Sequence, residues 1–72
     1  MALTREDLLR QLDRWLLAYE EKPKGRFAIK HEGRWLTLML IDGTWHWTTK
    51  QGQGTVNDDA ALESLLERVF PE

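Results

Sequence analysis

The strongest pattern in the chain is an apolar run over residues 34–41, in which both sets of alternating positions are largely apolar. This is typical of a strand in the middle of a sheet. The run follows Glu32-Gly33 and precedes Asp42-Gly43. An acidic residue followed by glycine between two strands is typical of a type I′ turn, because both turn positions need a positive φ. We therefore predict a three-stranded antiparallel meander, in the order 1-2-3, with strands over residues 26–31, 34–41 and 44–50.

These two turns also predict the register of the strands. The first turn pairs His31 with Arg34, the second pairs Ile41 with Thr44, and paired side chains point to the same side of a sheet. One face then holds large apolar residues, namely Phe27, Ile29, Leu36, Leu38, Leu40, Trp45 and Trp47. The other face is mixed and holds Ala28, Lys30, Trp35, Thr37, Met39, His46, Thr48 and Lys50. We expect the first face to form the core.

A helix is predicted before the meander. Leucine and aromatic residues recur at helical spacing from Leu8 to Tyr19, after a capping-box pattern at Thr4 and Asp7. The proline that follows ends the pattern, because proline disfavours helical geometry in the residue before it. We therefore expect a helix over about residues 4–21.

A second helix is predicted after the meander. Asn57-Asp58-Asp59 supplies a helix cap and acidic residues, and apolar residues recur at helical spacing from Ala61 to Phe70. We expect this helix over about residues 58–70, after a mobile loop at residues 51–56. The two apolar stripes need a surface to cover, so both helices should pack on the apolar face of the sheet. The predicted fold is a single small α+β domain that spans the whole chain, with the element order α-β-β-β-α.

Composition limits the classes of protein to which this chain can belong. Its 72 residues make one domain, and they include no cysteine, which excludes disulfides and thiolate metal sites. The formal net charge of −2 provides no general attraction to nucleic acid or to anionic membranes. No apolar run reaches the roughly 20 residues of a membrane-spanning helix, and the N-terminus lacks the apolar core of a signal peptide. We therefore expect a soluble cytoplasmic protein that does not bind membranes.

The residues that carry chemistry in enzymes are not grouped in this sequence. His31 and His46 fall on opposite faces of the predicted sheet, and neither has further ligands at the spacing of a metal site. The acidic residues occupy turns and helix ends, where each has a structural role. Ser64 is the only serine and has no histidine near it in sequence. We expect a non-catalytic protein without a cofactor or a metal ion.

The predicted order of elements resembles that of the double-stranded-RNA-binding domain over nearly the whole chain. Gly52-Gln53-Gly54-Thr55, before the last helix, is similar to the glycine-containing segment of that family. The resemblance implies the topology, but the family contacts RNA phosphates through a basic cluster at the start of its last helix. Those positions here read Asn57-Asp58-Asp59-Ala60-Ala61, so no RNA-binding residue is carried over.

The mixed face of the sheet is the predicted functional site. Tryptophan, methionine and arginine are enriched at protein interfaces. The residues predicted to bind a partner are Trp35, Thr37, Met39, Ile41, His46, Lys30, Lys50, Arg26 and Arg34. The leading hypothesis is a protein-binding module, a regulator or inhibitor of the kind that phages and mobile elements carry. The opposing interpretation is that Lys30 and Lys50 cover Trp35, so that the face binds nothing.

Two alternatives use the same sheet differently. In the first, Trp35 stacks on a base while nearby lysine and arginine residues contact phosphates, which makes the protein a nucleic-acid-binding module. In the second, two copies form a homodimer through their open faces or through an edge strand. The edges of the predicted meander are its first and third strands.

Overall fold

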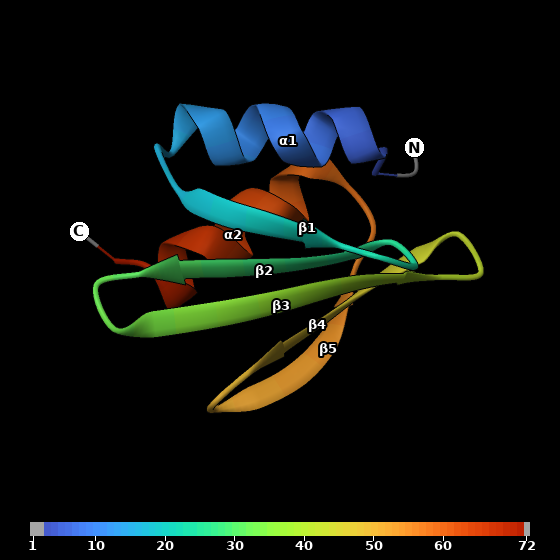
Figure 1. The fold of residues 1–72 in the computed structure, drawn as a ribbon. Coiled ribbons are helices and arrows are strands. Elements are labelled where there is room, and N and C mark those ends of the chain that lie inside the picture. The colour runs from blue at the N-terminus through green and yellow to red at the C-terminus, as the bar shows by residue number, and fades with distance from the viewer. Residues whose placement is uncertain (1–2, 72) are drawn as a thin grey trace.

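Two helices and five strands make up the part of the chain that the computed structural model describes, residues 3–71. In chain order the elements are α1 (Arg5–Arg14), β1 (Ala18–Lys22), β2 (Arg26–His31), β3 (Arg34–Ile41), β4 (Thr44–Thr49), β5 (Gly52–Val56) and α2 (Asp59–Val69). The strands form one antiparallel sheet in the order β1-β2-β3-β4-β5. Both helices lie on the same side of this sheet and leave its other side uncovered (Figure 1).

The three strands predicted from the sequence are present as β2, β3 and β4, although β4 ends one residue earlier than expected, at Thr49. Their register is the one that the turns predict. Lys30 pairs with Trp35 in the first hairpin, and Leu38 pairs with Trp47 in the second. The residues assigned to each side of these strands are therefore the residues found there.

The two turns have the predicted geometry. The φ angles are 51° and 80° at Glu32-Gly33, and 51° and 79° at Asp42-Gly43. Positive φ at both central residues is the requirement of a type I′ turn, whose twist matches that of the flanking strands. A one-residue slip at either turn would move every core side chain of a strand to the uncovered side, so the turns and the apolar pattern favour the same register.

The sheet has five strands rather than the three that were predicted. Residues 18–22, expected to continue the first helix, form β1 and pair with β2. Residues 52–56, expected to be a mobile loop, form β5 and pair with β4, with Val56 opposite Trp45. The edges of the sheet are therefore β1 and β5, and the prediction of edges at the first and third strands of a shorter meander is wrong.

The predicted helix over residues 4–21 stops early because the chain turns back at Leu16, whose φ is 56°. The amide of Leu16 donates to the carbonyl of Asp13 at 3.1 Å, and the amide of Leu17 donates to the carbonyl of Leu12 at 3.0 Å. This pair of hydrogen bonds is the Schellman motif, in which the residue with left-handed geometry is usually glycine. With leucine in that position, the sequence carries no stop signal before the proline.

Side chains attach β1 to the rest of the protein. Tyr19 lies against Phe27, with the two ring centroids 6.0 Å apart. Glu21 accepts two hydrogen bonds from the guanidinium of Arg5 at the start of α1, and Arg5 also lies over the Phe27 ring. These hydrogen bonds favour the ionised carboxylate, so they lower the pKa of Glu21. The inward-pointing side chains of β1 therefore contact both the sheet and α1.

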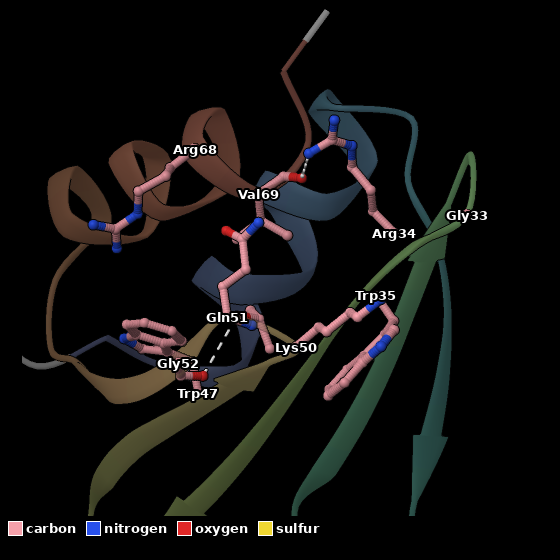
Figure 2. A pocket seen from close by; sticks show the side chains of 10 residues that line it. Gly33, Arg34, Trp35, Trp47, Lys50, Gln51, Gly52, Arg68 and Val69 are labelled. Carbon is pink, nitrogen blue, oxygen red and sulfur yellow. Dashed lines mark hydrogen bonds between the residues drawn. The ribbon is translucent and has the colours of Figure 1, made fainter.

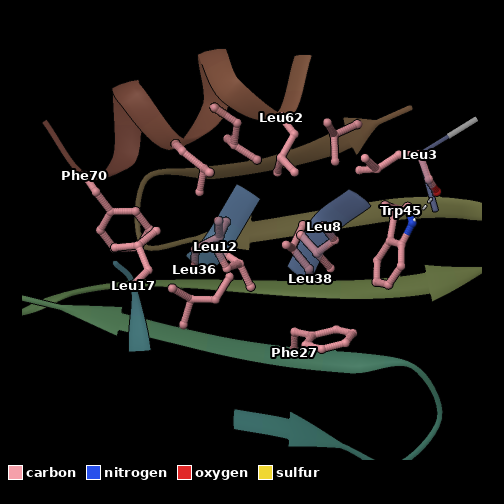
Figure 3. Close-up of a cluster of buried hydrophobic side chains, with 14 residues drawn as sticks. Leu3, Leu8, Leu12, Leu17, Phe27, Leu36, Leu38, Trp45, Leu62 and Phe70 are labelled. Carbon is pink, nitrogen blue, oxygen red and sulfur yellow. Dashed lines mark hydrogen bonds between the residues drawn. The ribbon is translucent and has the colours of Figure 1, made fainter. Parts of the chain in front are cut away.

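The core lies between the helices and the predicted apolar face of the sheet (Figure 3). Trp45 is 2% exposed, packs against Phe27 and donates from Nε1 to the carbonyl of Leu3 at 2.9 Å. The bond satisfies a buried indole N–H and ties the segment before α1 to β4. The other buried apolar residues are Leu8, Leu12, Leu17, Ile29, Leu36, Leu38, Val56, Leu62, Leu65, Leu66 and Phe70. Of the predicted core-face residues, Leu40 is exposed and Trp47 is half-buried.

Replacing Leu16 with glycine is expected to stabilise the fold by about 0.5–1 kcal/mol. Left-handed geometry costs a leucine roughly 1–2 kcal/mol, and glycine removes this cost. The greater freedom of glycine in the unfolded chain opposes the resulting stabilisation by about 0.5–1 kcal/mol. Leu16 is 86% exposed, so little buried surface is lost. Urea unfolding measures the change. Leu16→Ala keeps the unfavourable geometry and should stay within about 0.5 kcal/mol of the wild type; equal stability of the two variants would contradict this account.

Candidate functional site

The uncovered side of the sheet, called the open face below, consists of the residues that alternate with the core residues. These are Ala18, Glu20, Lys22, Arg26, Ala28, Lys30, Trp35, Thr37, Met39, Ile41, Thr44, His46, Thr48, Gln53 and Thr55. Trp35 and Ile41 are 38% and 44% exposed, while Met39 and His46 are half-buried. Apolar side chains this large and this exposed on one side of a sheet mark a candidate interaction site.

The structure brings most of the predicted site residues together. Trp35, Thr37, Met39, Ile41, His46, Lys30 and Arg26 lie on the open face, and Lys50 is in the turn that follows β4. Arg34 is not on this face. Its side chain points to the helix-covered side, where Nη1 donates to the carbonyl of Val69 at 3.5 Å. Arg34 lies off the open face because successive residues of a strand point to opposite sides, and Trp35 is on that face.

Charge is divided unevenly between the two sides of the protein. The open face and its margin carry Lys22, Arg26, Lys30 and Lys50, with Glu20 as the carboxylate among the strand positions. The helices and their flanking residues carry more carboxylates (Glu6, Asp7, Asp13, Asp58, Asp59, Glu63 and Glu67) than cations (Arg5, Arg10, Arg14 and Arg68). The overall charge of −2 therefore combines a basic open face with an acidic helical side.

The ring of Trp35 is not held under a cation. In residues 3–71 the cation–π contacts are those of Arg5 with Phe27 and of Arg68 with Trp47. With 38% of its surface exposed, Trp35 is the largest apolar side chain that the open face presents to solvent.

A second feature lies near the end of α2, at the end of the sheet where β3 begins and β4 ends (Figure 2). Three cations, Arg34, Lys50 and Arg68, surround a cleft of about 420 Å³, which we call the basic cleft. Its other lining residues are Gly33, Trp35, Trp47, Thr49, Gln51, Gly52 and Val69. Within residues 3–71, no carboxylate lines the cleft or forms an ion pair with its three cations. The cleft is therefore suited to an anionic group.

Trp47 forms a wall of the basic cleft and is held tightly by its neighbours. The guanidinium carbon of Arg68 lies 5.5 Å from the ring centroid of Trp47. Gly54, which pairs with Trp47 across the strands, lies so close that a Cβ atom there would be 2.9 Å from the ring. A side chain at position 54 would force the Trp47 ring or the strand to move. Gly54 therefore serves the packing of Trp47, whereas its presence in the sequence had indicated a mobile loop.

A groove continues from the basic cleft between β5 and α2, and we call it the edge groove. It shares Trp47 and Arg68 with the cleft, and the further residues that line it are Gly54, Thr55, Val56, Ala61, Ser64 and Leu65. Sequence reasoning missed both features because residues 51–56 were assigned to a loop. Lys50 and Arg68 come together only when β5 pairs with β4. The available signal was Val56, a β-branched apolar residue in an otherwise polar segment.

The histidines and the serine of the described residues lie apart from one another. From Leu3 to Pro71, no three His, Cys, Asp or Glu side chains are placed to hold a metal ion. His31 packs edge-on against Phe70, with ring centroids 6.2 Å apart, and Ser64 lines the edge groove. Neither helix in this part of the chain has the length and apolar character needed to cross a bilayer.

Comparison with known proteins gives no relative for this chain: no protein-family model, no curated protein and no solved structure matches it.

Replacing Gly54 with alanine is expected to destabilise the protein by about 1–3 kcal/mol, because the new Cβ atom must displace the Trp47 ring or shift β5. Urea unfolding followed by tryptophan fluorescence measures both the stability and the change around Trp47. Gly52→Ala, two residues away in the same strand, meets open space and serves as the control. Its stability should change by less than about 1 kcal/mol, and equal destabilisation by the two substitutions would contradict the packing argument.

Proposed function

We propose that this protein is a non-catalytic binding module that docks an acidic surface of another protein on its open face, and thereby acts as a regulator or inhibitor of that protein. The observation that carries this proposal is the exposure of Trp35 on the middle strand of an uncovered, basic sheet. The absence of cysteine from the sequence supports a cytoplasmic location, where disulfides are rare.

The shape of the open face supports docking of a folded partner. Trp35, Met39 and Ile41 lie along one side of β3, so they form a line of about 20 Å at the rise of roughly 3.4 Å per residue. β3 is paired on both sides, by β2 and β4, which holds this line rigidly before a partner arrives. A preformed surface loses less conformational entropy on binding than a flexible one.

The charge around this line indicates which partners are favoured. Lys30 is paired with Trp35, and Arg26 is paired with Met39, so cations flank the apolar side chains. Interfaces commonly combine an apolar centre with a polar rim, and complementary charge contributes most to specificity and to the association rate. An acidic partner surface is attracted by this rim, and a basic one is repelled.

Trp35→Ala is expected to reduce recovery of the partner at least tenfold when the immobilised protein is incubated with extract of its native cells. Truncation of a central tryptophan typically costs about 2 kcal/mol or more of binding free energy. Lys30→Glu should lower the same recovery by reversing the charge of the rim. Quantitative mass spectrometry of the retained proteins gives the measurement.

Leu16→Ala is the matched control, because Leu16 is an exposed apolar residue outside the open face. It should retain every partner of the wild type, and circular dichroism should show that all variants remain folded. Retention of all partners by Trp35→Ala and Lys30→Glu would exclude the open face as the binding site.

Nucleic acid is the second candidate partner, and the specific observation in its favour is the same grouping of Lys22, Arg26, Lys30 and Lys50 beside an exposed tryptophan. Bases stack on such rings, and cations contact the phosphates. Titration of the purified protein with single-stranded and double-stranded oligonucleotides at low salt separates the two candidates. No binding at tens of micromolar would eliminate the nucleic-acid alternative.

A further inference from the structure

The two edges of the sheet differ in how they are protected against pairing with another chain. β1 carries Glu20, Glu21 and Lys22, and the pairing of Glu21 with Arg5 holds α1 beside it. Charged residues of this kind discourage the addition of a further strand. β5 reads Gly-Gln-Gly-Thr-Val and contains neither a charged residue nor a proline. β5 is therefore the edge at which another strand can be added.

The backbone of β5 is available for such pairing. β5 is the last strand in the sheet order, so it is paired on one side only, by β4. Every other residue of an edge strand directs its N–H and C=O away from the sheet. Within residues 3–71, the backbone of β5 makes one hydrogen bond besides those that pair it with β4. In that bond the Gly52 carbonyl accepts from Thr49 Oγ1 at 3.4 Å.

The two ends of β5 carry opposite charge. Lys50 lies just before the strand and belongs to the basic cleft together with Arg34 and Arg68. Asp58 and Asp59 follow the other end of the strand. If a second β5 runs antiparallel beside the first, the acidic end of each strand lies beside the basic end of the other. The edge is therefore complementary to itself.

We infer that the protein forms a two-fold symmetric homodimer in which β5 pairs antiparallel with β5 of a second copy, to give a continuous ten-stranded sheet. Identical strands that pair antiparallel around a two-fold axis bring the same patch of each copy together, as isologous dimers require. Each of the two basic clefts then faces the Asn57-Asp58 segment of the other copy. This inference does not depend on the proposed function of the open face, because the residues of that face other than Trp35 lie outside the basic cleft.

The edge groove allows the second strand to approach. The α2 residues that border β5 include Ala61 and Ser64, which are small and exposed. Side chains of the added strand that point to the helix-covered side enter this groove beside Trp47. An unrelated acidic peptide could also bind in the basic cleft. A second copy of the chain, however, supplies both an unprotected edge strand and acidic residues at the end of that strand that meets the cleft.

Sedimentation velocity of the purified full chain tests the inference directly. The wild type is expected to sediment with twice the chain mass at tens to hundreds of micromolar. Lys50→Glu places a carboxylate opposite Asp58 of the other copy, so it should weaken the dimer at least tenfold. The double variant Asn57→Lys with Asp58→Asn reverses the charge at the other end of the strand and keeps a residue suited to cap α2. It should weaken the dimer to a similar extent.

Mixing the two weakened variants provides the discriminating measurement. In the mixed dimer, the carboxylate introduced at position 50 of one copy faces the ammonium group introduced at position 57 of the other. At the second contact the unchanged Lys50 faces the unchanged Asp58, so both contacts are attractive. Native mass spectrometry of the mixture should therefore show the mixed dimer as the main dimeric species, at near wild-type affinity. A peptide-binding role for the same edge predicts no such recovery.

Lys22→Glu is the matched control, since it makes the same change of charge on the other edge strand and should leave the dimer intact. Ile41→Ala should also leave it intact, because Ile41 is exposed on the open face and lines neither the basic cleft nor the edge groove. A monomeric wild type, full dimerisation of Lys50→Glu, failure of the mixture to recover, or loss of the dimer in Lys22→Glu or Ile41→Ala would each overturn the inference.

Discussion

Pairing of β3 with both of its neighbours is the constraint on which the other features depend. The two type I′ turns fix this pairing, and the pairing decides that Leu36 and Leu38 face the helices while Trp35 faces away. Trp45 then reaches the segment before α1, and the helices cover the side on which it lies. Because side chains alternate strictly along a strand, a buried side rich in apolar residues leaves a second side whose composition is free to serve binding.

The central hairpins followed from the sequence because local chemistry and long-range pattern agree there. In each of the two segments that were predicted wrongly, one residue occupies a position that its type does not indicate. Leu16 takes the left-handed position at the end of α1 that glycine usually fills, so the helix was predicted to continue through the residues that form β1. Gly54 serves the packing of Trp47, although glycine beside polar residues is typical of loops. Both depend on tertiary contacts that a periodicity argument does not contain.

The open face and the basic cleft differ in the same way in how far the sequence predicts them. Trp35, Met39 and Lys30 were predictable as neighbours because they belong to hairpins whose turns are local signals. The basic cleft was not predictable, because Arg68 reaches it from a helix and Lys50 from a turn that exists only when β5 joins the sheet. Surfaces built within one hairpin can thus be predicted from sequence alone, whereas a site assembled across a strand and a helix needs the fold.

The separation of charge between the sheet and the helices also gives the molecule an electric dipole, directed across the layers from the acidic helices toward the basic sheet. For the acidic partner proposed above, such a dipole would turn the protein before the two touch, so that more collisions would begin in an orientation that allows binding. The torque acts mainly over the last nanometre, because physiological salt screens charge beyond about 8 Å. The total charge of −2 meanwhile weakens non-specific binding to polyanions. The same distribution of charged side chains would therefore both orient the protein toward an acidic surface and limit non-specific binding.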